Sequence, residues 1–130
     1  MRLLLDTHIA LWAVYKPERL SEKARQLLTG ENVEVFVSAA SIWEIAIKNN
    51  RYPGQLPTVA EACADFTAAG FQDLPIHKQV MPVLESLPNL HSDPFDRLLI
   101  ATAFFEPMHL LTQDIKIAEY DATGNVVILC

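Results

Sequence analysis

The chain has 130 residues, a formal net charge of −6, and a composition that is 51% hydrophobic and 20% charged. Its length suits one domain over residues 1–130 with a single substantial core, and its apolar content excludes a disordered chain. The acidic balance argues against a generic basic surface for nucleic acid, although acids gathered around divalent cations would still attract phosphate.

The first half of the chain predicts alternating strands and helices. An apolar run leads into an Asp-Thr pair, Pro17 closes the segment after it, and Ser21 and Gly30 are placed to cap and to end another helix. β-branched and aromatic residues mark the clearest strand. The expected elements are strands at residues 2–5 and 33–38 and helices at residues 7–15, 22–29 and 41–51.

The second half continues the alternation. Thr58 and Glu61 have the spacing of a capping box, and Gly70 stops the helix that they begin. Asp93 and Pro94 are typical of an N-cap and a first helical residue. The expected elements are helices at 58–69 and 94–105, a helix that starts close to Pro82, and strands at 71–76, 109–112 and 126–129. This alternation predicts an α/β fold with a parallel sheet and helices on both of its faces.

The N-terminal apolar stretch and the cysteines bear on where the protein resides. Asp6 and His8 interrupt the stretch, which argues against a signal peptide or a membrane span. Cys63 and Cys130 are scattered in the chain, which predicts reduced thiols rather than a disulfide framework. On a helix, Cys63 would share a face with Phe66. We therefore expect a cytoplasmic protein with no membrane association.

Four acidic residues are expected to approach one edge of the predicted sheet. Asp6 directly follows the first strand, and Asp114 comes two residues after the strand at 109–112. Glu44 and Asp96 lie in the first turns of two predicted helices. Because ligands of open parallel sheets bind beyond the carboxyl ends of the strands, these four side chains are candidates for one site.

Three of these acids also have a structural interpretation when each is taken alone. Asp6 could cap the helix that begins with the next residue, and Asp114 could be a turn residue. Glu44 fits a capping box that starts at Ser41, and it has the favourable spacing for an ion pair with Lys48. The structural interpretation therefore stays open for each of them.

Asp96 has the weakest structural interpretation. It shares a helical face with Leu99, Ile100 and Ala103, so its carboxylate should point toward the core rather than into water. Asp93, three residues earlier, is placed to cap the same helix. We therefore assign Asp93 to the stability of the helix and Asp96 to the binding of a cation.

Taken together, the four acids indicate a metal site. Carboxylates that converge raise one another's pKa unless a cation neutralises them. Hard oxygen ligands suit Mg²⁺ or Mn²⁺, which also accept phosphate oxygens. The chemistry that this favours is phosphodiester hydrolysis, in which the metal generates a hydroxide and stabilises charge on the leaving oxygen.

The other polar candidates are weaker. No pair among the four histidines has a ligand spacing such as H-x-x-x-H, which favours structural roles for them. Lys48 and Arg51 share the helical face of Glu44, and Arg97 neighbours Asp96. These three basic side chains could contact RNA phosphates, or they could form an ordinary solvated face.

Four motifs together resemble a known family. They are "LLLDTHIALW", "SAASIWEIAIK", "HSDPFDRLLIATA" and "LLTQD", which occur in the family's order over essentially the whole chain. The chain resembles the PIN-domain ribonucleases, and specifically the VapC-like toxins of type II toxin–antitoxin systems. "DPFDRLLIATA" is the most specific of these pieces, and "LLTQD" alone would be weak.

The resemblance implies a fold, an activity and partners. The implied fold is a three-layer PIN-like fold with a five-stranded parallel sheet. The implied activity is RNA cleavage with Mg²⁺ or Mn²⁺, by a homodimer that a cognate antitoxin inhibits. The implied metal-binding acids are Asp6, Glu44, Asp96 and Asp114, with Thr7, Asp93 and Thr112 lining or supporting the site. Thr102 and Gln113 depart from the family pattern and bear on the choice of RNA rather than on activity.

Two rival functions fit parts of the same sequence. A haloacid-dehalogenase-like phosphatase also places Asp after its first strand, but it needs a second Asp where this chain has His8. A catalytically inactive domain of the same fold could bind RNA or protein only. The retention of all four acids argues against it, because a binding module gains nothing from mutual repulsion.

Overall fold

A parallel sheet of five strands forms the middle layer of the molecule, with the strand order β3-β2-β1-β4-β5. The structure is a computed structural model that describes residues 1–130. The strands are β1 (Arg2–Leu5), β2 (Glu34–Ser38), β3 (Gln72–Leu74), β4 (His109–Thr112) and β5 (Val127–Leu129). The helices are α1 (Thr7–Tyr15), α2 (Glu22–Leu28), α3 (Ala39–Arg51), α4 (Val59–Ala68), α5 (Met81–Ser86), α6 (Pro94–Phe105) and α7 (Ile115–Ala118), with 3₁₀ turns η1 (Pro17–Arg19) and η2 (Lys78–Val80).

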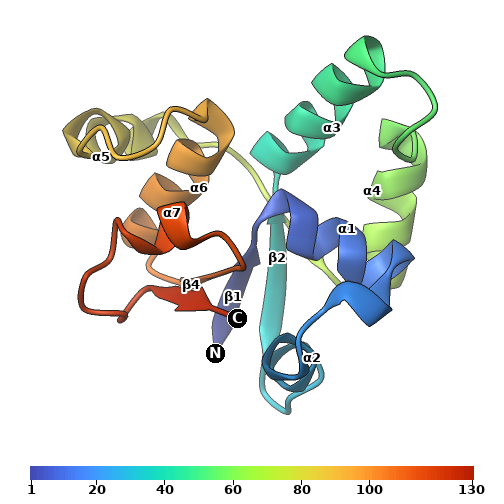
Figure 1. Ribbon diagram of the computed structural model, residues 1–130, viewed down its shortest axis with the longest axis horizontal. Coiled ribbons are helices and arrows are strands. Elements are labelled where there is room, and N and C mark those ends of the chain that lie inside the picture. Colours follow the sequence, from blue (N-terminus) through green and yellow to red (C-terminus); the bar gives the residue numbers. More distant parts are fainter.

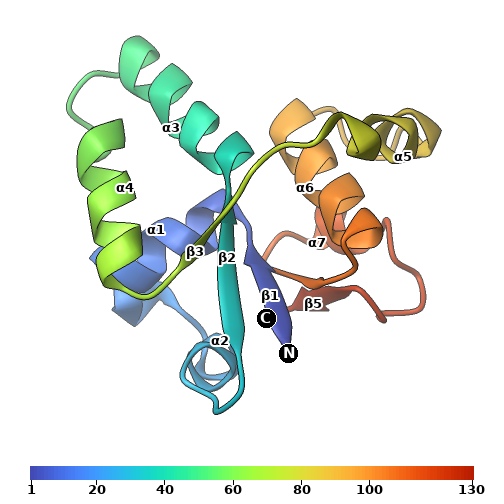
Figure 2. The same cartoon turned by 180° about the vertical axis from the view of Figure 1, so that it is seen from behind.

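Helices cover both faces of the sheet (Figure 1, Figure 2). Side chains alternate between the two faces along each strand, so each strand contributes to two apolar cores. Leu4, Phe36 and Leu110 pack in the core under α5, α6 and α7. Leu5 and Leu111 pack in the core under α1 to α4. The predicted α/β fold, with a parallel sheet between two helical layers, is therefore confirmed.

Local capping sets most of the helix starts. Asp6, Ser21, Thr58 and Asp93 each accept a hydrogen bond from a backbone N–H in the first turn of the helix that follows. Pro82 lies in the first turn of α5, as its missing N–H requires. The elements with the bounds expected from the sequence are β1, α1, α6 and β4.

Helix α3 begins earlier than the sequence predicts. Ser38 is its N-cap, and the Ser38 Oγ accepts a hydrogen bond from Ala40 N–H at 3.0 Å. Ser41 lies inside the helix and is buried, so the capping box that we expected between Ser41 and Glu44 is wrong. The physical reason is that Ser38, at the end of β2, is already in the extended conformation that an N-cap needs.

The structure also defines the surroundings of Cys63 and Asp114. Cys63 is exposed, because Ala62 and Phe66 are the residues of α4 that turn into the core. Asp114 does not lie in a simple turn, because it caps the short helix α7 and accepts a hydrogen bond from Lys116 N–H at 2.9 Å. A four-residue helix is too short to leave a periodic pattern in the sequence.

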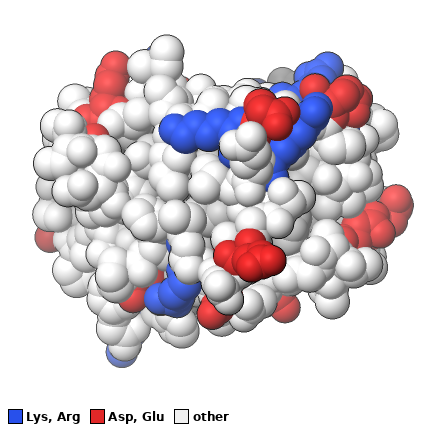
Figure 3. Space-filling model, turned by 90° about the horizontal axis from the view of Figure 1, so that it is seen from below, with Lys and Arg blue, Asp and Glu red and all other residues white.

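The surface carries mixed charge and the helices are short. Figure 3 shows acidic side chains in separate groups on one face, with Lys and Arg between them. None of the helices combines the length and the apolar character that crossing a membrane requires.

Candidate active site

Asp6 lies at the junction of β1 and α1, at the carboxyl end of the central strand. Its Oδ1 accepts a hydrogen bond from Ile9 N–H at 2.8 Å, so the capping role that the sequence left open is real. Its Oδ2 accepts a hydrogen bond from the hydroxyl of Thr112. Asp6 is only 5% exposed, and this burial raises the pKa of its carboxyl group. Capping alone does not explain a carboxylate buried this deeply.

Thr112 joins two of the predicted acids. It is fully buried at the end of β4, which pairs with β1 in the sheet. Its hydroxyl donates to Asp6 and accepts a hydrogen bond from Asp114 N–H at 3.0 Å. One hydroxyl therefore sets the position of Asp6 relative to the backbone of Asp114.

Asp93 caps α6, as the sequence predicts. Its Oδ1 accepts hydrogen bonds from the N–H groups of Phe95 and Asp96, at 2.8 and 3.1 Å. We expect Asp93→Ala to lower the free energy of unfolding by about 0.5–2 kcal/mol, and Asp93→Asn, which keeps a capping oxygen, to change it little. Urea denaturation of both variants in EDTA measures this. Equal losses in the two variants would contradict the capping assignment.

Asp96 is half-buried in the first turn of α6. Burial, followed by the negative charge of Asp93, raises its pKa to about 6. The negative charge of Glu44 also raises this pKa. Its Oδ2 lies 2.8 Å from the Nε2 of His91.

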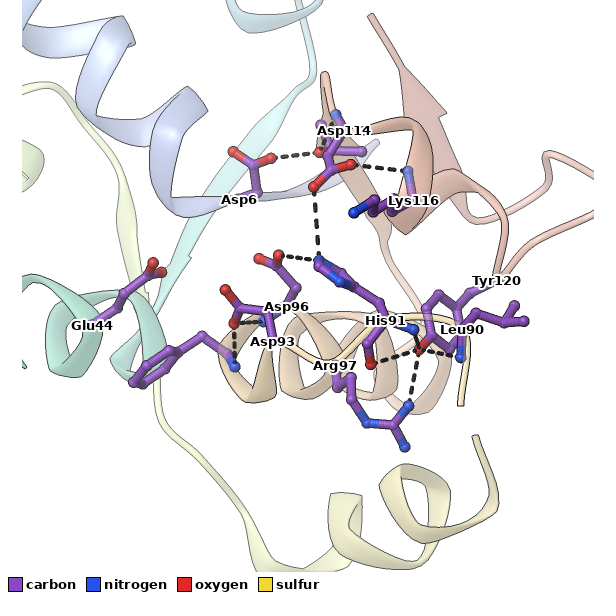
Figure 4. A network of polar contacts seen from close by, with 12 residues as sticks. Asp6, Glu44, Leu90, His91, Asp93, Asp96, Arg97, Asp114, Lys116 and Tyr120 are labelled. Carbon is purple, nitrogen blue, oxygen red and sulfur yellow. Dashed lines mark hydrogen bonds and ion pairs between the residues drawn. The ribbon is translucent and has the colours of Figure 1, made fainter. Parts of the chain in front are cut away.

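His91 is the member of this cluster that the sequence analysis missed. Its Nε2 lies 2.8 Å from Asp96 and 3.8 Å from the Oδ2 of Asp114. In Figure 4 the imidazole stands between these two carboxylates. The only sign of this role in the sequence is that His91 lies five residues before Asp96. A separation of five residues is not the spacing of a metal-binding motif.

Glu44 points toward the same region from α3, on the other side of the group (Figure 4). Its side chain is 6% exposed, and its Oε2 forms the predicted ion pair with Lys48 at 2.8 Å. Its Oε1 is buried and has no hydrogen-bond partner. A buried carboxylate oxygen without a partner is costly, so this atom is suited to a cation that the protein binds.

The supporting residue Thr7 holds α1 against α3. Its hydroxyl donates to the Oγ of Ser41 at 2.9 Å, and both side chains are buried. Ser41 lies one helical turn before Glu44 on α3. This bond therefore ties the start of α1, next to Asp6, to the part of α3 that carries Glu44.

The three basic side chains that were candidates for RNA contacts differ in their exposure and in the contacts that they already make. Lys48 pairs with Glu44 but is 40% exposed, and Arg51 is exposed with its guanidinium 5.8 Å from the ring of Tyr52. Arg97 donates to the carbonyl of Pro88 and to the hydroxyl of Tyr120, at 2.8 and 2.9 Å. These contacts give Arg97 a structural role, and its contact with RNA phosphates stays a prediction.

The structure gathers the predicted acids at one edge of the sheet to different degrees. The ligand atoms of His91, Asp96 and Asp114 all lie within 4.8 Å of one another. Asp6 joins this group through Thr112, and Glu44 faces it without a direct contact. The donors are mainly carboxylate oxygens, and one buried oxygen lacks a partner, so the residues present fit a divalent cation such as Mg²⁺ or Mn²⁺.

The fold, a parallel sheet between helices, and the acidic residues at its carboxyl edge define a class of protein. Comparison with known proteins identifies that class as a family. The family model described as PIN domain matches residues 3–122, so the chain belongs to the PIN-domain family. Within that family it is VapC-like. It is 30% identical over 119 residues to Ribonuclease VapC22 of Mycobacterium tuberculosis, and the match covers 91% of each chain.

Solved structures share the fold over nearly the whole chain. VapBC2 from Rickettsia felis, in a crystal structure bound to a DNA fragment from its promoter, matches with a TM-score of 0.72 and 14% identity, covering 99% of this chain and 98% of that chain. A toxin–antitoxin complex from Klebsiella pneumoniae matches with a TM-score of 0.62 and 17% identity, covering 97% and 95%. At these identities the structural matches show that the fold is shared.

Proposed function

We propose that this protein is a metal-dependent endoribonuclease and the toxin of a type II toxin–antitoxin pair, acting in the cytoplasm. The observation that carries the proposal is the group of acids at the carboxyl edge of the sheet, together with the buried Oε1 of Glu44 that has no partner. The similarity to a protein named as a ribonuclease supports the same activity. The residues that we assign to the cation are Asp6, Glu44, Asp96 and Asp114.

The proposed reaction needs a bound cation, acids that hold it and basic side chains that contact the RNA. A bound Mg²⁺ or Mn²⁺ would supply Lewis acidity that activates water and offsets negative charge on the phosphate. Asp96 and Asp114 face each other across His91, and a hydrogen bond from Thr112 holds the carboxylate of Asp6 in position near them. Lys48 and Arg51 lie on α3 beside Glu44, where we assign them to contacts with RNA phosphates.

The proposal predicts RNA cleavage that requires Mg²⁺ or Mn²⁺. We expect EDTA to abolish cleavage, because it removes the cation, and Asp114→Asn to reduce cleavage strongly, because it removes a carboxylate ligand. The matched control is Asp73→Asn, which changes an exposed aspartate on β3 outside the acidic group. Cleavage that persists in EDTA, or equal activity in Asp114→Asn and the parent protein, would exclude the metal mechanism.

An antitoxin protein is the proposed inhibitor, and a second copy of the chain is the proposed dimer partner. The VapBC and toxin–antitoxin complexes among the structural matches support the antitoxin. An apolar groove of about 540 Å³ suits an amphipathic helix of such a partner. It runs beside α3, and the residues that line it include Ala39, Ile42, Trp43, Ala46, Cys63 and Leu74.

The antitoxin is expected to place a Lys or Arg among the carboxylates. Such a side chain would satisfy them in place of metal, so inhibition should weaken as Mg²⁺ rises at constant ionic strength. The measurement is the inhibition constant of a candidate antitoxin at several Mg²⁺ concentrations. An inhibition constant that does not change with Mg²⁺ would mean that the antitoxin blocks access of RNA instead.

The two rival functions remain testable in the same assay. A catalytically inactive module would bind RNA without metal-dependent cleavage by any preparation. A haloacid-dehalogenase-like phosphatase would release phosphate from small esters, but His8 stands where its second aspartate would be needed, and His8 is exposed to solvent. The acid cluster and the similarity to a protein named as a ribonuclease favour the nuclease over both.

A further inference from the structure

We propose that His91 is a nitrogen ligand of the bound cation, and that it biases the site toward Mn²⁺ over Mg²⁺. This inference rests on the proposed function, since it concerns the same cation site. It adds to the four acids a residue of a different chemical type, carried by the loop between α5 and α6.

The ligand atoms of His91, Asp96 and Asp114 all lie within 4.8 Å of one another, which is close enough for one ion to reach them. Its Nε2 lies 2.8 Å from Asp96 Oδ2 and 3.8 Å from Asp114 Oδ2. Neighbouring ligands of an octahedral ion with bonds of about 2.1 Å lie about 3 Å apart. Two oxygens and one nitrogen thus need only small displacements to bind one ion.

The loop that carries His91 is held in place by a dedicated set of hydrogen bonds. The hydroxyl of Tyr120 accepts hydrogen bonds from the N–H groups of Leu90 and His91, at 3.2 and 2.8 Å. Arg97 donates to the same hydroxyl at 2.9 Å and to Pro88 O at 2.8 Å. Figure 4 shows the contacts of Tyr120 on the side of His91 that faces away from Asp96 and Asp114.

This arrangement links the loop to the elements that carry the acids. Arg97 is the neighbour of Asp96 on α6, and Tyr120 follows the helix α7 that Asp114 caps. His91 is therefore positioned by the same two elements as the carboxylates that it faces. An imidazole that only filled space would not require the backbone of His91 to be fixed relative to both Asp96 and Asp114.

A second observation, independent of the cluster, also points to a cation. The Oε1 of Glu44 is buried without a partner, its side chain is only 6% exposed, and the carboxylate is directed toward the cluster in Figure 4. The acids and His91 satisfy one another in part, but Glu44 Oε1 does not share in those contacts. A cation bound near His91 would give the Oε1 of Glu44 the partner that it lacks.

The imidazole determines which cation the site prefers. Mg²⁺ takes oxygen ligands and loses water reluctantly, whereas first-row transition ions accept imidazole nitrogen. Mn²⁺ combines that tolerance with a preference for carboxylates, so a mixed set of oxygens and one nitrogen favours it over Mg²⁺. The competing interpretation is that His91 only donates a hydrogen bond to Asp96, and a metal then has to displace it.

Mn²⁺ binding to the full chain distinguishes the two interpretations. Electron paramagnetic resonance counts free Mn²⁺ in a titration, and pulsed measurements on the bound ion detect coupling to a directly ligated nitrogen. We expect nitrogen coupling in the parent protein, its loss in His91→Gln, and a loss of Mn²⁺ affinity of about tenfold or more in that variant. Mg²⁺ affinity, measured by competition, should fall by less than about threefold, because oxygen ligands dominate its binding.

Two further variants complete the experiment. His8→Gln is the matched control, because His8 is an exposed histidine near Asp6 and should leave the nitrogen coupling unchanged. Tyr120→Phe keeps His91 but removes the oxygen that positions its loop, and should weaken both the coupling and Mn²⁺ affinity. This variant keeps the test decisive if His91→Gln does not fold.

Three results would count against the inference. Bound Mn²⁺ without nitrogen coupling, or a His91→Gln variant that binds Mn²⁺ as tightly as the parent or more tightly, would overturn the role of His91 and leave the proposed nuclease intact. A parent protein that binds no Mn²⁺ or Mg²⁺ would overturn the proposed metal site, and the role of His91 with it.

Discussion

Replacing Asp96 with asparagine is expected to abolish RNA cleavage while making the metal-free protein more stable. The substitution keeps the size of the side chain but removes the charge that we assign to the cation. It also removes repulsion between Asp96 and its neighbours Asp93 and Glu44, whose charges raise the pKa of Asp96. A single change therefore moves activity and stability in opposite directions, which damage to the fold would not do.

The stability effect depends on pH in a direction that the pKa determines. Burial raises the pKa of Asp96 from an ordinary 3.8 to about 6 in the folded protein. Between these values the folded state binds more protons than the unfolded state, so stability falls as pH rises from about 4 to about 6. Above that range the ionised carboxylate destabilises the metal-free fold by on the order of 1–2 kcal/mol, after screening by solvent.

The measurement is urea denaturation in EDTA at pH 4 and pH 7.5, together with RNA cleavage in Mg²⁺. The stability advantage of Asp96→Asn over the parent should be small at the lower pH and should grow at the higher one. Asp93→Asn is the matched control and should keep most of its activity. An inactive Asp93→Asn protein beside an active Asp96→Asn protein would overturn the roles that we assign to the two residues.

Thr112→Val is expected to have the second-largest effect, although it changes neither charge nor size. The Thr112 hydroxyl donates to Asp6 and accepts from Asp114 N–H, and it is fully buried. Without it, a buried carboxylate loses a donor and a backbone N–H loses its acceptor, which costs about 1–3 kcal/mol of stability. We expect metal affinity and cleavage to fall about 10–100-fold, as is usual when a residue that orients metal ligands is lost.

Thr112→Ser is the matched control for this prediction, because it keeps the hydroxyl and loses only a methyl group. It should retain most of the activity and most of the Mn²⁺ affinity. If Thr112→Ser is impaired while Thr112→Val keeps its activity, packing of the methyl group rather than the hydroxyl bridge would be the property that matters.

The fold could be predicted closely because its signals are local. The cap and proline at the start of α6, and the apolar runs of β1 and β4, lie within a few residues of the boundaries that they set. The start of α3 was misplaced because Ser38 and Ser41 both have the side chain of an N-cap, three residues apart. Only the end of β2 decides between them, and strand ends are weakly marked in a sequence.

The site was predictable only in part because its remaining contacts are long-range. The positions of the acids follow from the strand ends, so the sequence could place Asp6 and Asp114 at one edge. The burial of Glu44 and its partnerless oxygen depend on the packing of α3. His91 depends on the hydroxyl of Tyr120, 29 residues further along the chain, and no local pattern records that contact.

The bond between Thr112 and Asp6 spans 106 residues of sequence and has a consequence for synthesis of the protein. Asp6 leaves the ribosome 106 residues before Thr112, and β4 must then pair with β1. Contacts between such distant residues form late, because the long intervening chain must first be ordered. On the proposed function, a nascent chain therefore lacks part of its cleavage centre until Thr112 has been synthesised and β4 has paired with β1.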